Sequence, residues 1–315
     1  MDRRRLGRSD LQVSPLCLGG NVFGWTVDEA TAFTLFDAFL EAGCNFIDTA
    51  DVYSSWVPGN KGGESEIIIG KWIRARSNRD KVVVATKVGS EMGPGRKGLS
   101  KGYIRSAVEE SLRRLQTDYI DLYFSHWDDP DTAIEETLEA YGELIRAGKV
   151  RFIGASNFNA ARLKAAIGIS AKTGLPRYEC LQPHFNLIDR EGYQGELEKL
   201  CRGNEIGVVT YYALASGFLT GKYRSEKDIG QKARGTRVAN YLDERGFAVL
   251  EALDEVAAQV RATPAQVALA WLMARPGITA PIASATTIDQ LKELIAATRL
   301  KLDPASIERL DRAGA

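Results

Sequence analysis

The chain has 315 residues, of which 44% are hydrophobic, and its 41 basic residues balance its 41 acidic residues. This balance gives no basic footprint for nucleic acid or an anionic membrane surface as a partner, and no run of about 18 apolar residues predicts a transmembrane helix. Two histidines and four scattered cysteines give no metal-binding pattern, so we expect a cytoplasmic protein with reduced, buried thiols and no bound metal.

The N-terminal residues 3–19 are predicted to form a hairpin, and the rest of the chain alternates between strands and helices. Strands are expected at residues 16–18, 46–48, 82–86, 119–125, 150–155, 180–182, 206–211 and 278–283. Helices are expected at residues 27–42, 65–76, 101–116, 131–147, 160–173, 195–202, 244–261, 264–275, 289–298 and 304–313. The stretch 215–240, rich in Gly and Lys, interrupts the alternation.

Repeated strand–helix units imply parallel strands. Eight such units without a visible linker fit a closed (β/α)₈ TIM barrel better than an open sheet. We therefore predict one barrel domain over residues 1–315, with an N-terminal hairpin, extra helices and no Rossmann domain. The acidic run at 128–131 is expected to cap the helix that follows it.

Polar residues follow three successive predicted strands. Asp48 and Tyr53 follow one, Lys87 ends the next, and His126 ends the third. Residues at the carboxyl ends of barrel strands face the ligand site, so these four are expected to converge. The Lys87 ammonium, oriented by Asp48, is expected to lower the pKa of Tyr53, which is ordinarily about 10. His126 is expected to hydrogen-bond a substrate oxygen.

This group is suited to general acid catalysis of hydride addition to a carbonyl. Lys87 taken alone leaves another hypothesis open, a Schiff-base aldolase on the same kind of barrel. The string Gly93-Pro94-Gly95-Arg96-Lys97-Gly98 matches G-x-G-x-x-G, but it neither follows the first strand nor directly opens a helix. We interpret it as a flexible loop at the mouth of the site.

From end to end, the sequence resembles the aldo-keto reductase superfamily. The matching strings are Leu18-Gly19-Gly20, Phe46-Ile47-Asp48-Thr49-Ala50-Asp51-Val52-Tyr53, Ala85-Thr86-Lys87, Asp121-Leu122-Tyr123-Phe124-Ser125-His126, Ile153-Gly154-Ala155-Ser156-Asn157-Phe158 and Gly217-Phe218-Leu219-Thr220-Gly221-Lys222. The resemblance implies a barrel that binds NADP(H) across its strand ends. It also implies a catalytic tetrad of Asp48, Tyr53, Lys87 and His126, with Tyr53 as the general acid.

The resemblance further implies cofactor contacts in three places. Those around the nicotinamide are Ser156, Asn157, Gln182 and Tyr211, the last stacking on the ring. Those on the pyrophosphate are Leu214, Ser216, Lys222 and Arg234, because backbone amides and two cations suit a diphosphate. Those near the adenosine and its 2′-phosphate are Ser284, Thr286, Gln290 and Glu293. Three further residues are also expected to contact the cofactor: Gly20, Asn21 and Asp48.

Departures from the family pattern bear on the choice of cofactor. Tyr212 stands where many relatives have serine, and it is expected to change the course of the loop that follows. Thr286 supplies a hydroxyl at a helix start but no positive charge. We therefore expect a preference for NADP(H), with an NAD(H)-preferring alcohol or sugar dehydrogenase as the alternative.

Three tryptophans and two tetrad residues are predicted to bind the substrate: Trp25, Tyr53, Trp56, His126 and Trp127. An aromatic pocket favours a planar or apolar carbonyl compound. A cofactor-binding regulatory subunit, similar to potassium-channel beta subunits, is a further alternative, but the intact His126 opposes it. The sequence leaves open the substrate, the reaction direction and the oligomeric state.

Overall fold

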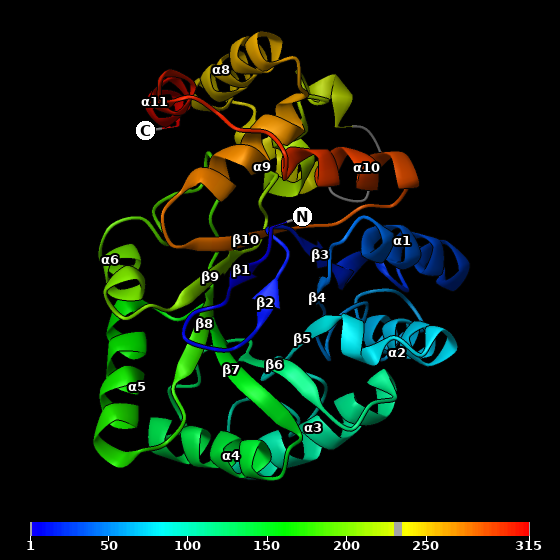
Figure 1. The fold of residues 1–315 in the computed structure, drawn as a ribbon, viewed down its shortest axis with the longest axis vertical. Helices are drawn as coiled ribbons and strands as arrows, with labels where there is room; N and C mark the ends of the chain where they lie inside the picture. Colours follow the sequence, from blue (N-terminus) through cyan, green and yellow to red (C-terminus); the bar gives the residue numbers. More distant parts are fainter. Residues whose placement is uncertain (1, 230–234, 315) are drawn as a thin grey trace.

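The fold is built around a closed ring of parallel strands (Figure 1). The computed structural model describes residues 2–229 and 235–314. Within these ranges the barrel strands, in chain order, are β3 (Cys17–Gly19), β4 (Phe46–Asp48), β5 (Val83–Val88), β6 (Ile120–Ser125), β7 (Val150–Ser156), β8 (Tyr178–Gln182), β9 (Gly207–Thr210) and β10 (Ile278–Ala283). Each strand pairs with its neighbour in sequence, and β10 pairs with β3 to close the ring. The predicted (β/α)₈ barrel is confirmed.

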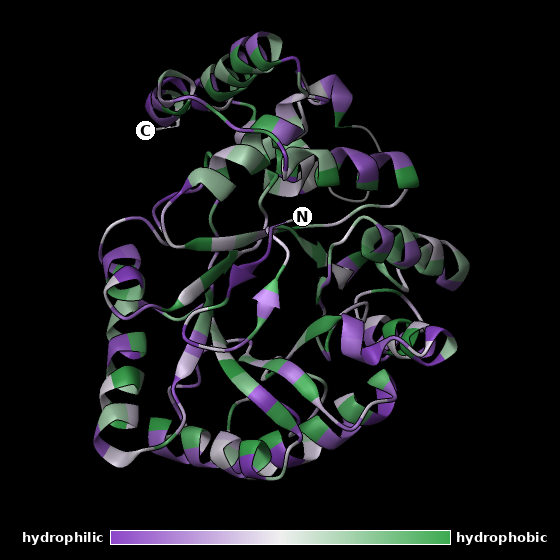
Figure 2. Ribbon diagram, viewed as in Figure 1, coloured by the Kyte–Doolittle hydropathy of each residue, from purple (hydrophilic) through white to green (hydrophobic). Residues whose placement is uncertain are grey.

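Helices surround the ring on the outside (Figure 1). The longer ones are α1 (Glu29–Glu41), α2 (Glu64–Arg76), α3 (Lys101–Leu115), α4 (Ile134–Arg146), α5 (Ala160–Thr173), α6 (Glu196–Gly203), α8 (Glu244–Val260), α9 (Pro264–Ala274), α10 (Ile288–Ala297) and α11 (Pro304–Ala313). Figure 2 shows hydrophobic and hydrophilic stripes side by side on α3 to α6, as expected for helices that bury one face. In the described ranges, none of the helices combines the length and the apolar character needed to span a membrane.

The described part of the stretch that interrupts the alternation contains short helical turns. They are η3 (Ala215–Thr220), η4 (Glu226–Asp228), α7 (Gly235–Val238) and η5 (Ala239–Tyr241). Two further 3₁₀ turns, η1 (Gly20–Val22) and η2 (Arg79–Lys81), follow β3 and precede β5. A strand end that leads into such a turn exposes backbone amides and side chains at the carboxyl end of the barrel.

The N-terminal hairpin of β1 (Arg4–Arg5) and β2 (Gln12–Val13) covers the amino-terminal end of the barrel. Its apolar residues Leu6, Leu11 and Val13 are buried in one cluster with strand residues that point into the barrel, such as Phe46 and Leu122. This plug keeps the barrel interior apolar beneath the strand ends. The polar groups at the opposite end therefore lie above a medium of low dielectric constant.

One predicted helix start is wrong. The acidic run at 128–131 does not cap α4, whose N-cap is Ala133 without a side-chain hydrogen bond. Instead, Asp128 pairs with Arg162, and the Asp129 carboxylate accepts hydrogen bonds from the backbone of Leu99 and from Thr132. These carboxylates fix the loop against its neighbours, because both lie within reach of donors from other elements.

Close packing between α2 and α3 gives a stability prediction. A β-carbon built on Gly70 of α2 would lie 2.3 Å from the carbonyl oxygen of Arg114, whereas one on Gly102 of α3 would meet no atom within 4 Å. Gly70→Ala is expected to destabilise the fold by about 1–3 kcal/mol through overpacking. Gly102→Ala, the matched control, is expected to stabilise it by about 0.5–1 kcal/mol. Urea unfolding measures the free energy of unfolding of both variants. Equal changes in the two would contradict the close packing of α2 against α3 at Gly70.

Candidate active site

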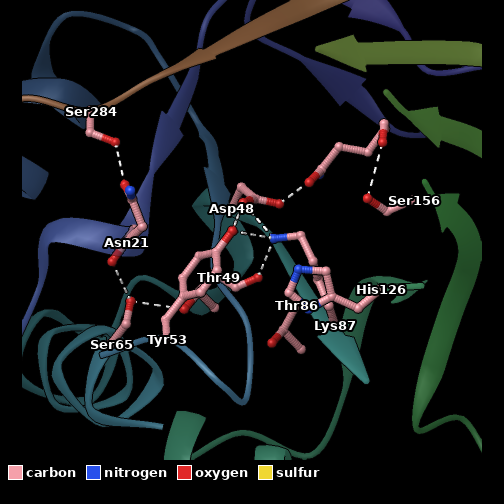
Figure 3. Close-up of polar contacts among 12 residues, drawn as sticks. Asn21, Asp48, Thr49, Tyr53, Ser65, Thr86, Lys87, His126, Ser156 and Ser284 are labelled. Atoms are coloured by element: carbon pink, nitrogen blue, oxygen red, sulfur yellow. Dashed lines mark hydrogen bonds and ion pairs between the residues drawn. The ribbon is translucent and has the colours of Figure 1, made fainter. Parts of the chain in front are cut away.

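The register of the parallel strands brings three tetrad residues together. Asp48 pairs with Ala85 between β4 and β5, and Lys87 pairs with Phe124 between β5 and β6. His126 follows β6 directly, and its backbone N–H donates to Val88 O at 2.8 Å. Tyr53 comes from the loop after β4. The four predicted residues therefore meet at the carboxyl end of the barrel (Figure 3).

Lys87 is at the centre of this group, and its side chain has no exposed surface. The ammonium donates to Asp48 Oδ2 at 2.6 Å, to Thr49 O at 2.7 Å and to Tyr53 OH at 2.9 Å. These acceptors match the three N–H donors of an ammonium group. A buried charge is tolerated only when it is paired and hydrogen-bonded, and both conditions hold for Lys87.

Tyr53 differs from the prediction in its pKa. Its hydroxyl donates to Asp48 Oδ2 at 3.2 Å. Burial and the Asp48 carboxylate raise the pKa of Tyr53 well above its ordinary value, although Lys87 is adjacent. The expected lowering is therefore wrong for this arrangement, because a phenol that donates to a carboxylate is stabilised in its neutral form. Tyr53 holds its proton.

His126 lies beside Tyr53, with the two ring centres 6.2 Å apart. Burial and the Lys87 charge lower the pKa of His126 well below its ordinary value, so the imidazole is neutral at pH 7. Its Nδ1 lies 2.9 Å from Ser90 Oγ. Ser90 was missed by the sequence analysis, since no motif marks it, and Gly89 at φ +114° turns the chain there.

A second layer links the tetrad to the residues expected around the nicotinamide. Gln182 Nε2 donates to Asp48 Oδ1 at 2.9 Å, and Ser156 Oγ donates to Gln182 O at 3.0 Å. Asn157 Nδ2 donates to His126 O at 2.9 Å, and Tyr211 OH donates to Asn157 Oδ1 at 2.7 Å. Gln182 and Asn157 thus bond the tetrad directly, and Ser156 and Tyr211 are connected to it through these two residues.

The turn after β9 combines a left-handed backbone with a nearby cation. Leu214 precedes three residues with left-handed φ values, which are Ala215 at 46°, Ser216 at 57° and Gly217 at 99°. A β-carbon on Gly217 would lie 3.3 Å from Lys222 Nζ, so the ammonium lies close to this turn. Ala215 N and Gly217 N already donate to Tyr212 O and Leu214 O, so the nearby Lys222 cation is the feature of this turn that suits a diphosphate. Arg234, predicted to contact the same group, lies outside the described residues.

Tyr212 takes a left-handed backbone conformation at φ 53°. Its hydroxyl accepts a hydrogen bond from the Arg237 guanidinium, which also lies over the Tyr212 ring at 5.4 Å. The large side chain therefore connects the start of the loop with α7.

The residues expected near the adenosine lie at the start of α10, apart from the tetrad. Thr286 N and Oγ1 both donate to Gln290 Oε1, at 2.8 and 3.0 Å. The Glu293 carboxylate accepts from Thr263 Oγ1 at 2.6 Å and so connects α10 with α9. Between them and the tetrad, Ser284 Oγ donates to Asn21 Oδ1 at 2.7 Å across the β10–β3 seam. Gly20 at this seam is tightly enclosed, since a β-carbon built on it would lie only 2.7 Å from Asp48 O.

Aromatic rings extend outward from the tetrad toward solvent. Trp56 lies 6.2 Å from Tyr53 and 5.7 Å from Trp25. Trp127 stacks on His126 at 6.0 Å. Trp56 and Trp127 are about half exposed, at 48% and 52%. The five residues predicted to bind the substrate therefore form a continuous aromatic surface that starts at the Tyr53 ring.

Comparison with known proteins agrees with this geometry. Residues 15–315 match the model of the Aldo/keto reductase family. The chain belongs to this family. It is 38% identical to the uncharacterized oxidoreductase YrpG of Bacillus subtilis, over 99% of this chain and 95% of that protein. It is 32% identical to protein tas of Escherichia coli (96% and 94%) and 31% identical to norsolorinic acid reductase of Aspergillus flavus (96% and 78%).

As a member of the aldo/keto reductase family, the protein is an oxidoreductase, and the family generally uses NAD(P)H. The sequence resemblance is thereby confirmed. The family match covers the strands that carry the tetrad and the turn after β9.

Asp51 follows the catalytic strand but takes no part in the tetrad. It is buried, and neither carboxylate oxygen has a hydrogen-bond partner among the described residues. Burial, and then the nearby Glu66 carboxylate, raise the pKa of Asp51 to about 8. Glu66 itself is held by Arg114 and Thr86, each at 2.6 Å. Asp51 is therefore a protonated acid at neutral pH.

This raised pKa predicts a pH-dependent stability. Above about pH 4 the unfolded chain ionises Asp51 while the folded protein retains the proton until about pH 8, so stability falls as pH rises between these values. Asp51→Asn removes the effect. Its free energy of unfolding relative to wild type should rise by about 2–3 kcal/mol from pH 5.5 to pH 7.5. The exposed Asp118→Asn is the control, and parallel wild-type and Asp51→Asn curves would contradict the prediction.

Proposed function

We propose that this protein is an NADPH-dependent carbonyl reductase that converts an aldehyde or ketone to an alcohol, with Tyr53 as the general acid. The observation that carries the proposal is the Lys87 ammonium, enclosed between Asp48 and the Tyr53 hydroxyl beside a neutral His126. The family membership and the relative named as a norsolorinic acid reductase support a reductase.

The residues around the turn after β9 and around Tyr211 suit a nicotinamide dinucleotide. In this proposal, Ser156, Asn157, Gln182 and Tyr211 hold the nicotinamide, Leu214, Ser216 and Lys222 hold the pyrophosphate, and Gly20, Asn21, Ser284, Thr286, Gln290 and Glu293 border the remainder. Such a dinucleotide supplies a hydride when bound. All other steps depend on the chain's own side chains.

Proton transfer starts from the Tyr53 hydroxyl. As the carbonyl oxygen gains negative charge, Tyr53 delivers its proton and the oxygen becomes the alcohol. The Lys87 ammonium, 2.9 Å away, stabilises the phenolate that remains. Asp48 holds the ammonium in place and accepts from Tyr53 until the proton leaves. A high pKa in the resting site keeps the proton available until negative charge develops.

His126 orients the carbonyl oxygen in this scheme. A neutral imidazole donates from one nitrogen and accepts at the other. When the Ser90 hydroxyl donates to Nδ1, Nε2 carries the proton and is free to donate to the substrate. Ser90 thus acts through His126 as a positioning residue.

The Schiff-base alternative is opposed by the state of Lys87. A nucleophilic amine must be neutral and reach its carbonyl, but this ammonium is buried and held by three acceptors. The aromatic surface of Trp25, Trp56 and Trp127 supports a planar or apolar carbonyl compound as substrate.

Tyr53→Phe tests the catalytic assignment. The variant lacks the proton donor but retains the ring, so kcat is expected to fall at least about a hundredfold, while the Kd for NADPH changes less than about threefold. Steady-state reduction of an aromatic aldehyde and titration of intrinsic fluorescence measure the two quantities. If this variant had the kcat of the wild-type protein, Tyr53 would not be the general acid.

The choice of cofactor is tested by titrating the wild-type protein with NADPH and NADH. Tighter binding of NADPH, by about tenfold or more, is expected if Thr286 and the start of α10 accept the 2′-phosphate. Comparable or tighter NADH binding would keep the reductase and overturn this preference. Failure to bind either would overturn the proposed function.

Ser90→Ala tests how His126 is oriented. Loss of one hydrogen bond of about 1 kcal/mol to Nδ1 is expected to lower kcat about fivefold. Ser90→Thr, which keeps the hydroxyl, should retain most of the activity. If both variants lose activity equally, the hydroxyl has no orienting role.

A further inference from the structure

A second polar cluster lies beside Tyr211, on the segment that follows β8. Backbone pairing continues past the strands here, because His184 forms a parallel bridge with Tyr211 and Tyr211 N donates to Pro183 O at 3.0 Å. The His184 ring stacks on the Tyr211 ring, with centres 5.3 Å apart and planes 18° apart. Tyr212 contacts the same two rings edge-on at 5.3 and 5.2 Å. One face of Tyr211 is thus covered by an imidazole.

His184 is in turn held by a carboxylate. Its Nε2 is buried and lies 3.1 Å from Asp189 Oδ2, an ion-pair distance, and it forms no hydrogen bond of good geometry with the described residues. The same Asp189 oxygen accepts from Asn186 Nδ2 at 2.7 Å and from Tyr241 OH at 2.8 Å. Burial raises the pKa of Asp189, but the contacts with His184, Asn186 and Tyr241 outweigh it and lower this pKa below its ordinary value. Asp189 is therefore a carboxylate that joins the segment after β8 to η5.

The contacts continue from Tyr241 to the turn after β9 (residues 214–217), called the phosphate turn below. The Tyr241 ring in η5 stacks on Phe218 in η3, with centres 5.3 Å apart and planes 27° apart. Phe218 is buried and follows Gly217 directly. A continuous path of contacts thus runs from Tyr211 through His184, Asp189 and Tyr241 to the turn after β9.

We propose that His184 and Asp189 form a clasp that fixes Tyr211 and the phosphate turn relative to each other, so that the two halves of a dinucleotide bind cooperatively. This inference rests on the proposed function, which places the nicotinamide on Tyr211 and the pyrophosphate at Ser216. His184 and Asp189 are positioning residues here, because neither touches the tetrad. Tyr211 and the turn after β9, held at a fixed spacing, match a ligand that spans both. Because they are ordered when the protein folds, binding of the ligand does not carry that loss of conformational entropy.

The clasp makes a distinct prediction about ligand size. A full dinucleotide spans Tyr211 and the turn after β9 and gains from the clasp. Adenosine 2′,5′-bisphosphate lacks the nicotinamide, so it does not reach Tyr211 and gains nothing from the fixed spacing. A purely structural role would instead lower the Tm and weaken both ligands together.

Three variants test the clasp. Tyr241→Phe removes the hydrogen bond to Asp189 but keeps the stack on Phe218. His184→Phe keeps a ring against Tyr211 but removes the polar contact. Tyr193→Phe is the matched control, because the buried Tyr193 hydroxyl has no hydrogen-bond partner among the described residues. Intrinsic fluorescence gives the Kd for NADPH and for adenosine 2′,5′-bisphosphate, and calorimetry gives the Tm.

Tyr241→Phe and His184→Phe are each expected to weaken NADPH binding about tenfold, as for a lost hydrogen bond to a charged group. Binding of adenosine 2′,5′-bisphosphate should stay within twofold, and Tyr193→Phe should match wild type for both ligands. The double variant should bind NADPH within about twofold of the weaker single variant, since both act through Asp189. If the wild-type protein prefers NADH, the same measurements use NADH instead of NADPH and AMP instead of adenosine 2′,5′-bisphosphate.

Unchanged NADPH affinity in both single variants would overturn the clasp. Equal weakening of the dinucleotide and its fragment, or additive effects in the double variant, would do so as well. Each of these results leaves the proposed function intact, because each one is obtained only if the wild-type protein binds the dinucleotide. A wild-type protein that binds no dinucleotide overturns the proposed function instead.

Discussion

The burial of a charged lysine at the end of a parallel barrel is the constraint on which the rest of the site depends. Lys87 is held without exposed surface by Asp48, Thr49 and Tyr53. An ammonium in this position is costly unless every N–H finds an acceptor, so the strands that carry Asp48 and Lys87 must keep their register. The hairpin plug below them keeps water out and strengthens each of these contacts. The same register brings Gln182 to the second oxygen of Asp48 and thereby joins β8 to the catalytic group.

The parts of this arrangement that follow from strand patterning could be predicted from the sequence. Apolar runs that end in Asp48, Lys87 and His126 indicate both the strands and the side of the barrel on which these residues meet. Loops were less predictable, because their course depends on backbone turns and on contacts between distant segments. Ser90 reaches His126 only because the chain turns at Gly89. The carboxylates at 128 and 129 suggest a helix cap in sequence, yet Arg162 and the Leu99 backbone bind them from other elements.

The pKa of Tyr53 was mispredicted for a related reason. The sequence predicts that the Lys87 cation lies beside the Tyr53 phenol. It does not show that the Asp48 carboxylate also accepts the phenol's hydrogen bond. In the folded protein the Asp48 carboxylate accepts from both Lys87 and Tyr53, so its charge acts on each of them. The phenol is then neutral at rest. In the proposed mechanism, Lys87 contributes mainly after proton transfer, when Tyr53 carries a negative charge. Such an effect stabilises the transition state in preference to the ground state.

Two carboxylates, Asp48 and Asp189, each bring several polar side chains together. Asp48 accepts from Lys87, Tyr53 and Gln182, while Asp189 is approached by His184, Asn186 and Tyr241. Asp48 collects donors from β5, β8 and the loop after β4, whereas Asp189 connects the segment after β8 with η5. In the proposed function, the first carboxylate sets the chemistry and lies on a barrel strand, where little change is tolerated. The second depends on loops beyond β8 and β9, where sequences vary more freely. In the proposed function, ligand preference is therefore free to change through Asp189 and the tryptophans at the mouth, while Tyr53 and Lys87 stay fixed.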